Sequence, residues 1–407
     1  MKPAKYKFTL LKQVMDIIPA YTVSKIARHH GVDKKSRVFT PWSHVVSMIF
    51  AQLSHALSLN DVCDTLRNHA SALATIRHAV PPSRNGLSHA NKVRSSEMAK
   101  GLFYEVLGTL HGSFPKFGRF DVPFKLSRKI KRTINIVDST TIQLFANCMN
   151  WAKHRRRKAA AKCHMLLDAQ TFLPRFAVIK TAKSSDAVMA RILCNPLRDG
   201  EIVIFDKAYV HFQHLFELMQ RGVLWVTRAK SNMDYTVIKR FKRSGSIILD
   251  AEIRLQGIKS RKDYPQSLRL IIADVLRDGK MVRMEFITGN FEFAASTIGE
   301  LYKARWDIEL FFKQLKQTLK LSDFLGYSEN AVQWQVWMAL LSYVILRFIA
   351  YMSKWKGTFA RLFTTVRGVL WSYYDMFALL ESCCGTAYGR RRMCTQPQQL
   401  YLALDIR

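Results

Sequence analysis

Acidic residues are scarce in this sequence of 407 residues. Asp and Glu number 30 against 63 Lys and Arg, which gives a formal net charge of +33 at pH 7. A chain with this imbalance repels itself unless it meets a polyanion. Nucleic acid is therefore the first partner to consider, ahead of an anionic membrane surface. Hydrophobic residues make up 49% of the chain, which is enough for a core and excludes a disordered polybasic tail.

Paired cysteines and long apolar runs are also lacking. The seven cysteines are odd in number and include no Cys-x-x-Cys pair, so we expect neither a disulfide framework nor a zinc site. We therefore expect an intracellular protein. The basic start Met1–Lys7 leads into no apolar segment, so we expect no signal peptide. The most apolar stretch, Val336–Leu346, is shorter than the roughly 20 residues of a membrane span, which predicts a buried helix and no membrane partner.

The first part of the chain, residues 1–120, is predicted to be a helical domain. Trp42–Leu53 has the spacing of a buried helix, and Ser58 with Asp61 forms a capping box that opens the next one. After Pro81-Pro82, a third helix is expected from Leu87 to His111. Short helices with surplus basic residues fit a DNA-binding domain, and a plain helical bundle with a basic surface fits them equally well.

Residues 121–229 change to a mixed pattern. Three strands joined by short connections predict an antiparallel meander, and strands that alternate with helices then predict parallel pairing. Together they indicate an α/β chain with an RNase H-like core. The expected strands are Thr133–Val137, Lys162–Asp168, Pro174–Ile179, Ile202–Phe205 and Leu224–Thr227, with helices over 184–197 and 210–221.

Residues 230–290 are predicted to be a β-rich insertion in this core. Leu268–Leu276 and Met281–Ile287 are apolar, strand-like runs, and Asp278-Gly279 lies between them. Because Asp-Gly favours the tight type I′ turn, the two runs predict a β-hairpin.

Helices are expected to complete the chain. The core helix in residues 291–325 is predicted to run from Thr297 to about Leu319, with Thr297 and Glu300 forming a capping box at its start. A C-terminal helical region, residues 326–407, follows.

Two aspartates stand directly after predicted strands. Asp138 follows the first strand of the meander, and Asp206 follows Ile202–Phe205. If these strands are neighbours, both carboxylates leave the same end of the sheet and attract a hard cation such as Mg²⁺. Taken singly, an Asp after a strand is more often a turn former or helix cap.

The core helix supplies a third acid. Tyr302, Arg305, Glu309 and Lys316 are separated by three, four and seven residues, which places them within about 60° of one another on an α-helix. Glu309 is expected at the edge of the buried side, whereas Asp307 is expected to face solvent. Taken alone, Arg305 and Glu309 would be an ordinary i,i+4 surface pair.

Three carboxylates at one sheet end suit phosphoryl transfer with two Mg²⁺ ions about 3.5–4 Å apart, for which Mn²⁺ can substitute. Arg305 and Lys316 would then hold phosphates, and Tyr302 would stack on a base or bond a phosphate. A dense basic run is expected to form a loop on the DNA path, the alternative being a merely solvated loop. Its basic residues are Lys153, Arg155, Arg156, Arg157 and Lys158.

The spacing Tyr302-(2)-Arg305-(3)-Glu309-(6)-Lys316 is that of the YREK signature, and the sequence resembles the bacterial transposases of the "insertion sequence four" family. Asp138 in Ile-Val-Asp-Ser-Thr and Asp206 in Phe-Asp-Lys-Ala-Tyr resemble their two catalytic aspartates, although many relatives carry glycine where Lys207-Ala208 stand. The resemblance extends over nearly the whole chain. It includes Trp225–Asn232 and, as a softer match to the helical domain of one branch, Ser36-Arg37, Phe50–Leu53 and Leu87–Asn91.

The resemblance implies a cut-and-paste DDE transposase that binds the terminal inverted repeats of its element on double-stranded DNA and pairs two ends in a homodimer. Water cuts one strand, the 3′-OH attacks the opposite strand to give a hairpin in relatives, and the reopened ends join target DNA. Asp138, Asp206 and Glu309 are the implied catalytic metal ligands. The DNA contacts implied near the cut are Tyr302, Arg305 and Lys316. Relatives hold a flipped base on aromatics in or near the β-rich insertion. The sequence does not assign that aromatic here, and Trp225 is only a guess. The expected location is the bacterial cytoplasm, at the nucleoid.

Two other functions compete with this interpretation. One is an RNase H-fold DNA nuclease without strand transfer. The other is a non-catalytic DNA-binding derivative of a transposase, against which the presence of all three carboxylates argues.

Overall fold

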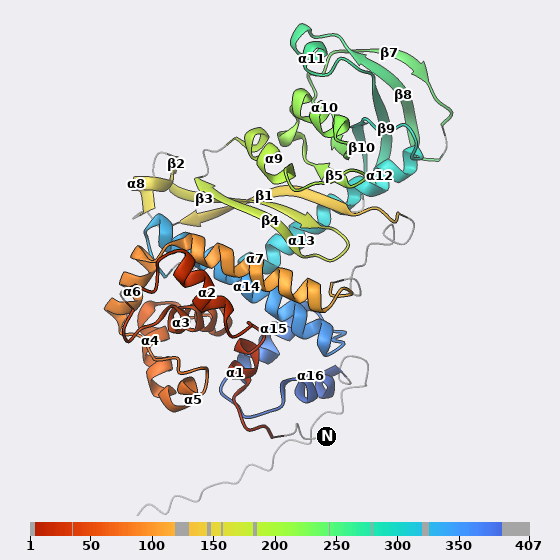
Figure 1. Ribbon diagram of the computed structural model, residues 1–407. Helices are drawn as coiled ribbons and strands as arrows, with labels where there is room; N and C mark the ends of the chain where they lie inside the picture. The colour runs from red at the N-terminus through yellow and green to blue at the C-terminus, as the bar shows by residue number, and fades with distance from the viewer. Residues whose placement is uncertain are drawn as a thin grey trace, which may run out of the picture.

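The computed structural model describes residues 5–34, 36–118, 130–144, 148–155, 158–181, 185–243, 245–277, 280–319 and 325–384. The chain is a mixed α/β protein in which a large sheet lies against helices on both faces (Figure 1). Helices from the two ends of the chain pack together below the sheet in this view. They share one hydrophobic cluster with strand residues, and the domain boundaries given above remain a prediction.

The helices of the N-terminal part surround the C-terminal helix α14 (Glu329–Met352), which contacts α3 and α7. The predicted capping box is confirmed: the Ser58 hydroxyl accepts from the Asp61 N–H, and the Asp61 carboxylate accepts from the Ser58 N–H. The helices are α1 (Leu10–Met15), α2 (Thr22–His29), α3 (Pro41–Ser54), α4 (Leu59–Asn68), α5 (Ala70–Ala74), α6 (Arg84–Val93), α7 (Ser96–Ser113), α15 (Phe359–Gly368) and α16 (Met376–Cys384).

The single helix expected from Leu87 to His111 is wrong, because α6 ends at Val93 and α7 begins at Ser96. Arg94 adopts an extended conformation between them. Its carbonyl oxygen accepts from the Asn330 side-chain amide at 2.7 Å and from the Trp334 indole N–H at 2.7 Å. The backbone thus leaves the helix to bind α14, a tertiary contact that local spacing does not encode.

Helix α14 contains the most apolar stretch of the sequence. By length and composition alone it could cross a membrane, but 83% of its most apolar window is buried inside the protein. Every residue of Val336–Leu346 is buried. The prediction of a buried core helix is confirmed.

The sheet contains the predicted meander and parallel strands, in the order β2-β3-β1-β5-β6, with β4 paired to β3. Strands β1, β3 and β4 are antiparallel neighbours, whereas β1, β5 and β6 run parallel. The strands are β1 (Ile134–Leu144), β2 (Lys153–Arg155), β3 (Lys158–Asp168), β4 (Pro174–Thr181), β5 (Ile202–Phe205) and β6 (Leu224–Arg228). Helix α8 (Met149–Ala152) precedes β2, α9 (Asp186–Cys194) precedes β5, and the 3-10 turn η3 (Lys207–Tyr209) and α10 (Phe212–Gln220) follow it.

Two predictions in this region are corrected. The first strand does not end at Val137, because β1 continues to Leu144 and Asp138 lies within it. The basic run is not simply a loop, since Lys153–Arg155 forms β2 and pairs with the start of β3 at Lys158. Arg156 and Arg157 lie outside the described residues.

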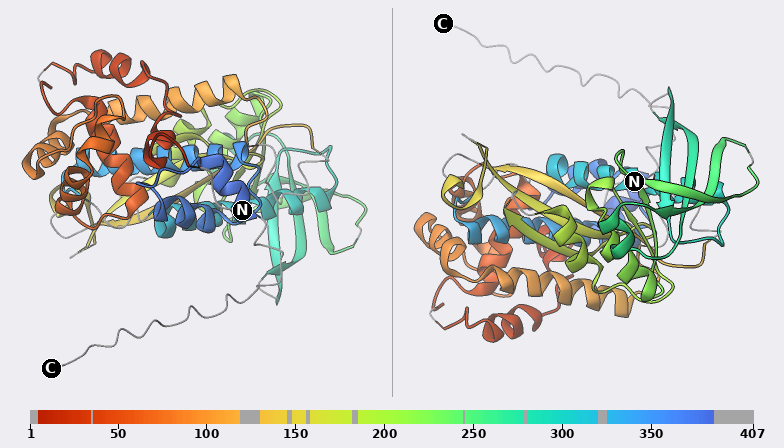
Figure 2. Two further views of the ribbon diagram at one scale, coloured as in Figure 1. Left: turned by 90° about the horizontal axis from the view of Figure 1, so that it is seen from below. Right: turned by 90° about the horizontal axis from the view of Figure 1, so that it is seen from above.

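The insertion extends the same sheet. Its strands are β7 (Tyr235–Arg240), β8 (Ile247–Leu255), β9 (Leu268–Arg277) and β10 (Lys280–Thr288), and α11 is Ile258–Asp263. The β9–β10 hairpin is confirmed, although its turn at 278–279 lies outside the described residues. Because β10 pairs with β6, the sheet runs unbroken from the core into the insertion, which projects from one end of the molecule (Figure 2).

The core helix expected from Thr297 consists of four consecutive pieces. They are α12 (Ala295–Lys303), the 3-10 turn η4 (Ala304–Trp306), α13 (Asp307–Lys313) and the π turn η5 (Gln314–Thr318). The capping box at Thr297 and Glu300 is wrong, because the helix begins two residues earlier with Ala294 as N-cap and no side-chain cap.

Alternation along the strands separates two cores. Ile136 and Ile204 face the cluster that includes α12, α13 and α14, whereas Val137 and Phe205 face the cluster under α9 and α10. Because side chains alternate along a strand, Asp138 and Asp206 are in phase with the first set. Both acids are thus directed toward the core helix.

Candidate active site

The register of two parallel strands brings the two predicted aspartates together. Strands β1 and β5 pair with Val137 opposite Phe205, so the next residues, Asp138 and Asp206, are neighbours across the two strands. Asp206 directly follows β5, as expected, and φ and ψ at Asp206 remain extended. The sequence of β5, Ile-Val-Ile-Phe, is buried on both faces, so the strand that precedes Asp206 is packed on both sides.

Asp138 is a largely buried carboxylate with two partners. One oxygen accepts from the Ser139 backbone N–H at 2.7 Å, and the other accepts from Arg305 Nη1 at 3.1 Å. Its side chain is 17% exposed. Burial raises the pKa of Asp138 from 3.8 to about 6 and outweighs the Ser139 N–H and Arg305, which lower it, while the charges of Asp206 and Glu309 raise it further.

Tyr302 holds the second aspartate. It lies in the last turn of α12, is 1% exposed, and donates its hydroxyl to Asp206 Oδ1 at 3.3 Å. Burial raises the pKa of Tyr302 to about 12. The phenol therefore stays neutral near pH 7 and keeps its proton for this hydrogen bond.

Arg305 links the core helix to the first aspartate. Its side chain is 11% exposed. The guanidinium donates from Nη1 to Asp138 and from Nη2 to Glu309 Oε1, each at 3.1 Å. Its Cζ also lies 5.7 Å from the centroid of the Tyr302 ring. Tyr302, Arg305 and Glu309 thus lie on one face of the core helix, as their spacing predicted.

Two details of that face differ from expectation. The Glu309 side chain is 58% exposed, not at a buried edge. Asp307, expected to face solvent, is half-buried, and burial raises its pKa to about 6. The 3-10 turn at Ala304–Trp306 winds the helix more tightly than an α-helix, so angles computed for a uniform α-helix drift here.

Lys316 lies one piece further along the helix, in the π turn η5. It is half-buried, and burial lowers its pKa. Short π segments often mark functional positions in helices. Among the contacts of the described residues, Lys316 does not join the cluster formed by Asp138, Asp206, Tyr302, Arg305 and Glu309.

The chemistry of these acids suits a divalent cation. Carboxylate oxygens are the ligands that Mg²⁺ prefers, and Asp138 and Asp206 stand side by side on the same sheet face. Within the described part of the chain, however, no group of three His, Cys, Asp or Glu side chains is arranged to hold an ion. Arg305 lies between Asp138 and Glu309 and contacts both.

The opposite face of the same strands carries a polar cluster that the sequence reasoning left out. The His164 side chain is fully buried, with Nδ1 3.4 Å from the Tyr209 hydroxyl and 3.5 Å from Asp186 Oδ1. Asp186 also accepts from Lys162 Nζ at 2.6 Å. Burial lowers the pKa of His164 to about 4, so the imidazole is neutral near pH 7. Two polar residues in alternation on β3, Lys162 and His164, are the sequence signal for this cluster.

Trp225 does not fit the role of a base-holding aromatic. It lies in β6, is 1% exposed, and packs edge to face against Tyr264 with ring centroids 6.1 Å apart. A base cannot reach its ring in this conformation, so Trp225 is a core residue.

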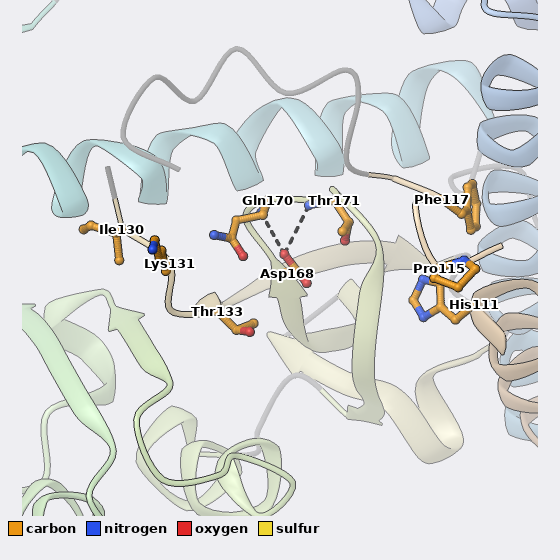
Figure 3. A pocket seen from close by; sticks show the side chains of 9 residues that line it. All are labelled: His111, Pro115, Phe117, Ile130, Lys131, Thr133, Asp168, Gln170 and Thr171. Carbon is orange, nitrogen blue, oxygen red and sulfur yellow. Dashed lines mark hydrogen bonds between the residues drawn. The ribbon is translucent and has the colours of Figure 1, made fainter. Parts of the chain in front are cut away.

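A cavity of about 670 Å³ has Asp168, Gln170 and Thr171 among its lining residues (Figure 3). Among its lining residues, Asp168 accepts from the Gln170 and Thr171 backbone N–H groups at 2.7 and 3.1 Å. Asp168 pairs with Asn135 at the start of β1, whereas Asp206 follows the end of the parallel strand β5. The cavity is therefore at the opposite end of the strands from Asp206 and is no part of the candidate active site.

Comparison with known proteins points to one family. The family described as "Transposase DDE domain" matches residues 129–345, and a domain of unknown function (DUF4372) matches residues 7–76. A Sinorhizobium fredii protein whose name places it among the transposases, y4zB, is 30% identical over 79% of this chain and 86% of its own length.

Two further relatives carry names of insertion sequence elements. A probable transposase for insertion sequence element IS5377 of Geobacillus stearothermophilus is 27% identical over 65% of this chain and 68% of its own length. The transposase InsG for insertion sequence element IS4 of Escherichia coli is 24% identical over 42% of this chain and 40% of its own. A solved piggyBac transposase synaptic complex with hairpin DNA aligns with a TM-score of 0.42 and 10% identity over 95% of this chain and 84% of that one. The chain therefore belongs to the DDE transposases of the IS4 family.

Proposed function

We propose that this DNA transposase has an RNase H-like catalytic core and moves its element by cut-and-paste, with Asp138, Asp206 and Glu309 as catalytic metal ligands. One observation carries the proposal: Asp138 and Asp206 follow paired positions of the parallel strands β1 and β5. Both face the helix that carries Glu309. The strand order β4-β3-β1-β5-β6 supports the RNase H-like assignment.

The chemistry needs a strong positive field at the reacting phosphate. When bound, two Mg²⁺ ions, or Mn²⁺ in their place, would activate the attacking oxygen and stabilise the leaving oxygen. The protein's own groups position the acids: the Ser139 N–H fixes Asp138, and the Tyr302 hydroxyl fixes Asp206. Preorganised ligands lower the cost of reaching the reactive geometry.

The substrate is proposed to be double-stranded DNA that carries the terminal inverted repeats of the element, held by a homodimer that pairs two ends. The charge of +33 supports a polyanionic partner. Tyr302, Arg305 and Lys316 are proposed to contact DNA beside the cut. The basic run is proposed to contact phosphates further along the duplex, through Lys153, Arg155, Arg156, Arg157 and Lys158.

A cleavage assay tests this proposal. Purified protein is incubated with Mg²⁺ and a DNA duplex that carries the inverted repeat flanking the gene of this protein. The strands are then separated on a denaturing gel. Wild type should cut at the repeat boundary, whereas Asp206→Asn should not. Asp307→Asn is the matched control, because it removes an acid from the core helix outside the proposed ligand set, and it should retain cleavage. Cleavage by Asp206→Asn would show that the site assignment is wrong.

A second substrate separates the transposase from the two competing functions. Ends that are already cut and carry a 3′-OH should be joined to target DNA by the wild type. A nuclease would cut the intact repeat and never join these ends. A non-catalytic DNA-binding derivative would bind the repeat without cleavage or joining.

A further inference from the structure

Arg305 bridges two of the three proposed metal ligands. Its two terminal nitrogens contact two different acids, Asp138 and Glu309, each at 3.1 Å. The Arg305 side chain is 11% exposed, so it is largely withdrawn from water. One positive group therefore bridges the two carboxylates from within the cluster.

The same oxygens cannot serve Arg305 and a metal ion equally well. Asp138 already directs one oxygen at the Ser139 N–H, which the backbone fixes, and the other at Arg305. A Mg²⁺ ion needs its ligand oxygens at about 2.0–2.1 Å in strict geometry. An adjacent guanidinium also repels the ion strongly in a partly buried site. Metal binding and the Arg305 bridge therefore compete for Asp138.

Arg305 is not fully satisfied where it lies. Its Nε is buried and makes no hydrogen bond among the described residues. An unsatisfied buried donor costs about 1–3 kcal/mol. The two non-bridging oxygens of a phosphodiester can accept two parallel hydrogen bonds from the planar guanidinium, including one from Nε. A DNA phosphate at the site would therefore draw Arg305 away from the acids.

We propose that Arg305 is a resident counter-cation that keeps the acids closed to divalent ions until a DNA phosphate takes over its guanidinium. This rests on the proposed function, because it assumes that Asp138, Asp206 and Glu309 bind the metal. DNA and metal then bind cooperatively, and the free protein binds metal weakly. By linkage, DNA raises the metal affinity by the same factor as metal raises the DNA affinity.

Metal binding without DNA tests the exchange directly. Mn²⁺ is titrated into metal-free protein, and the unbound ion is followed by electron paramagnetic resonance. Arg305→Gln removes the charge and should bind Mn²⁺ about tenfold more tightly than wild type, within the range usual for coupled sites. Arg305→Lys keeps a positive charge but cannot bridge both acids. Its Mn²⁺ affinity should lie between those of wild type and Arg305→Gln. Equal or weaker binding by Arg305→Gln, with its fold confirmed by circular dichroism, overturns the proposal.

Two controls separate the causes of failure. Lys303→Gln removes an exposed charge from the same helix and should stay within about twofold of wild type, since exposed charges act weakly. A random-sequence duplex, which supplies phosphates without the repeat, should tighten Mn²⁺ binding to wild type and much less to Arg305→Gln. Asp206→Asn is also tested in the Arg305→Gln background. If that double variant still binds Mn²⁺, the proposed metal site is wrong, and so is the proposal that Arg305 is exchanged for a metal ion when DNA binds. If Asp206→Asn abolishes binding but Arg305→Gln does not tighten it, only the exchange is wrong.

Discussion

The buried carboxyl of Asp138 should make the free energy of unfolding depend on pH. Its pKa rises from 3.8 to about 6 in the folded protein, so the folded state binds a proton where the unfolded chain has released it. The stability that goes with this proton is full below about pH 4 and is lost as pH rises through about 6. A difference of about two pKa units corresponds to about 3 kcal/mol at neutral pH.

Asp138→Asn removes this cost, because the amide has the same shape and no charge to bury. The variant should unfold with a free energy about 3 kcal/mol higher than wild type at pH 7.5 and only about 1 kcal/mol higher at pH 4.5. Urea denaturation with EDTA at both pH values measures the difference. If Asp138→Asn also abolishes cleavage, as the proposed function expects, the gain in stability means that the buried charge serves function at the expense of stability.

The control is Asp64→Asn, an exposed acid in an i,i+3 pair with Arg67. Its stability should stay within about 0.5 kcal/mol of wild type at both pH values. The reasoning is refuted if Asp138→Asn is no more stable than wild type at pH 7.5, or if its advantage is the same at pH 4.5.

Three more outcomes are expected. Arg269→Met should lower the free energy of unfolding by about 3–5 kcal/mol, because it leaves the buried carboxylate of Asp250 without its partner. Each oxygen of Asp250 lies 2.8 Å from a nitrogen of Arg269. An unchanged midpoint in urea denaturation would contradict this. Asn330→Ala should lower the free energy of unfolding by about 2–3 kcal/mol, since it removes hydrogen bonds to the carbonyl oxygens of Asn91 and Arg94 and from the N–H of Ser96. A thermal melt would show the loss as a lower midpoint. Lys158→Ala should weaken the salt dependence of DNA binding: the slope of log affinity against log salt concentration should fall by about one in magnitude. An unchanged slope in a filter-binding series would show that Lys158 does not contact a DNA phosphate.

Local rules predicted the parts of the fold that local chemistry determines. The capping box at Ser58, the buried strand Ile202–Phe205 and the β9–β10 hairpin are as expected, because side-chain caps, apolar runs and turn residues act within a few positions. The helix break at Arg94 and the length of β1 escaped prediction. Both depend on partners far along the chain, α14 in one case and β3 in the other.

The candidate site followed the same division. The neighbouring placement of Asp138 and Asp206 was predicted correctly, because each follows an apolar run on neighbouring parallel strands. The expected end of the first strand at Asp138 was not correct, since β1 continues to Leu144. Helical spacing likewise grouped Tyr302, Arg305 and Glu309. What spacing could not give was the exposure of Glu309, the burial of Asp307 or the bridge made by Arg305, since these depend on a 3-10 turn and on rotamers chosen by tertiary packing.

The pairing of β10 with β6 has a consequence for shortened copies of this gene. The stretch from 230 to 290 interrupts the chain between β6 and α12, so its deletion would seem to leave a smaller enzyme. Yet β10 covers the hydrogen-bonding edge of β6, and its loss would bare that edge two strands from Asp138. Uncovered edges pair with other chains. Internally deleted descendants of the element should therefore accumulate as aggregates rather than as miniature transposases.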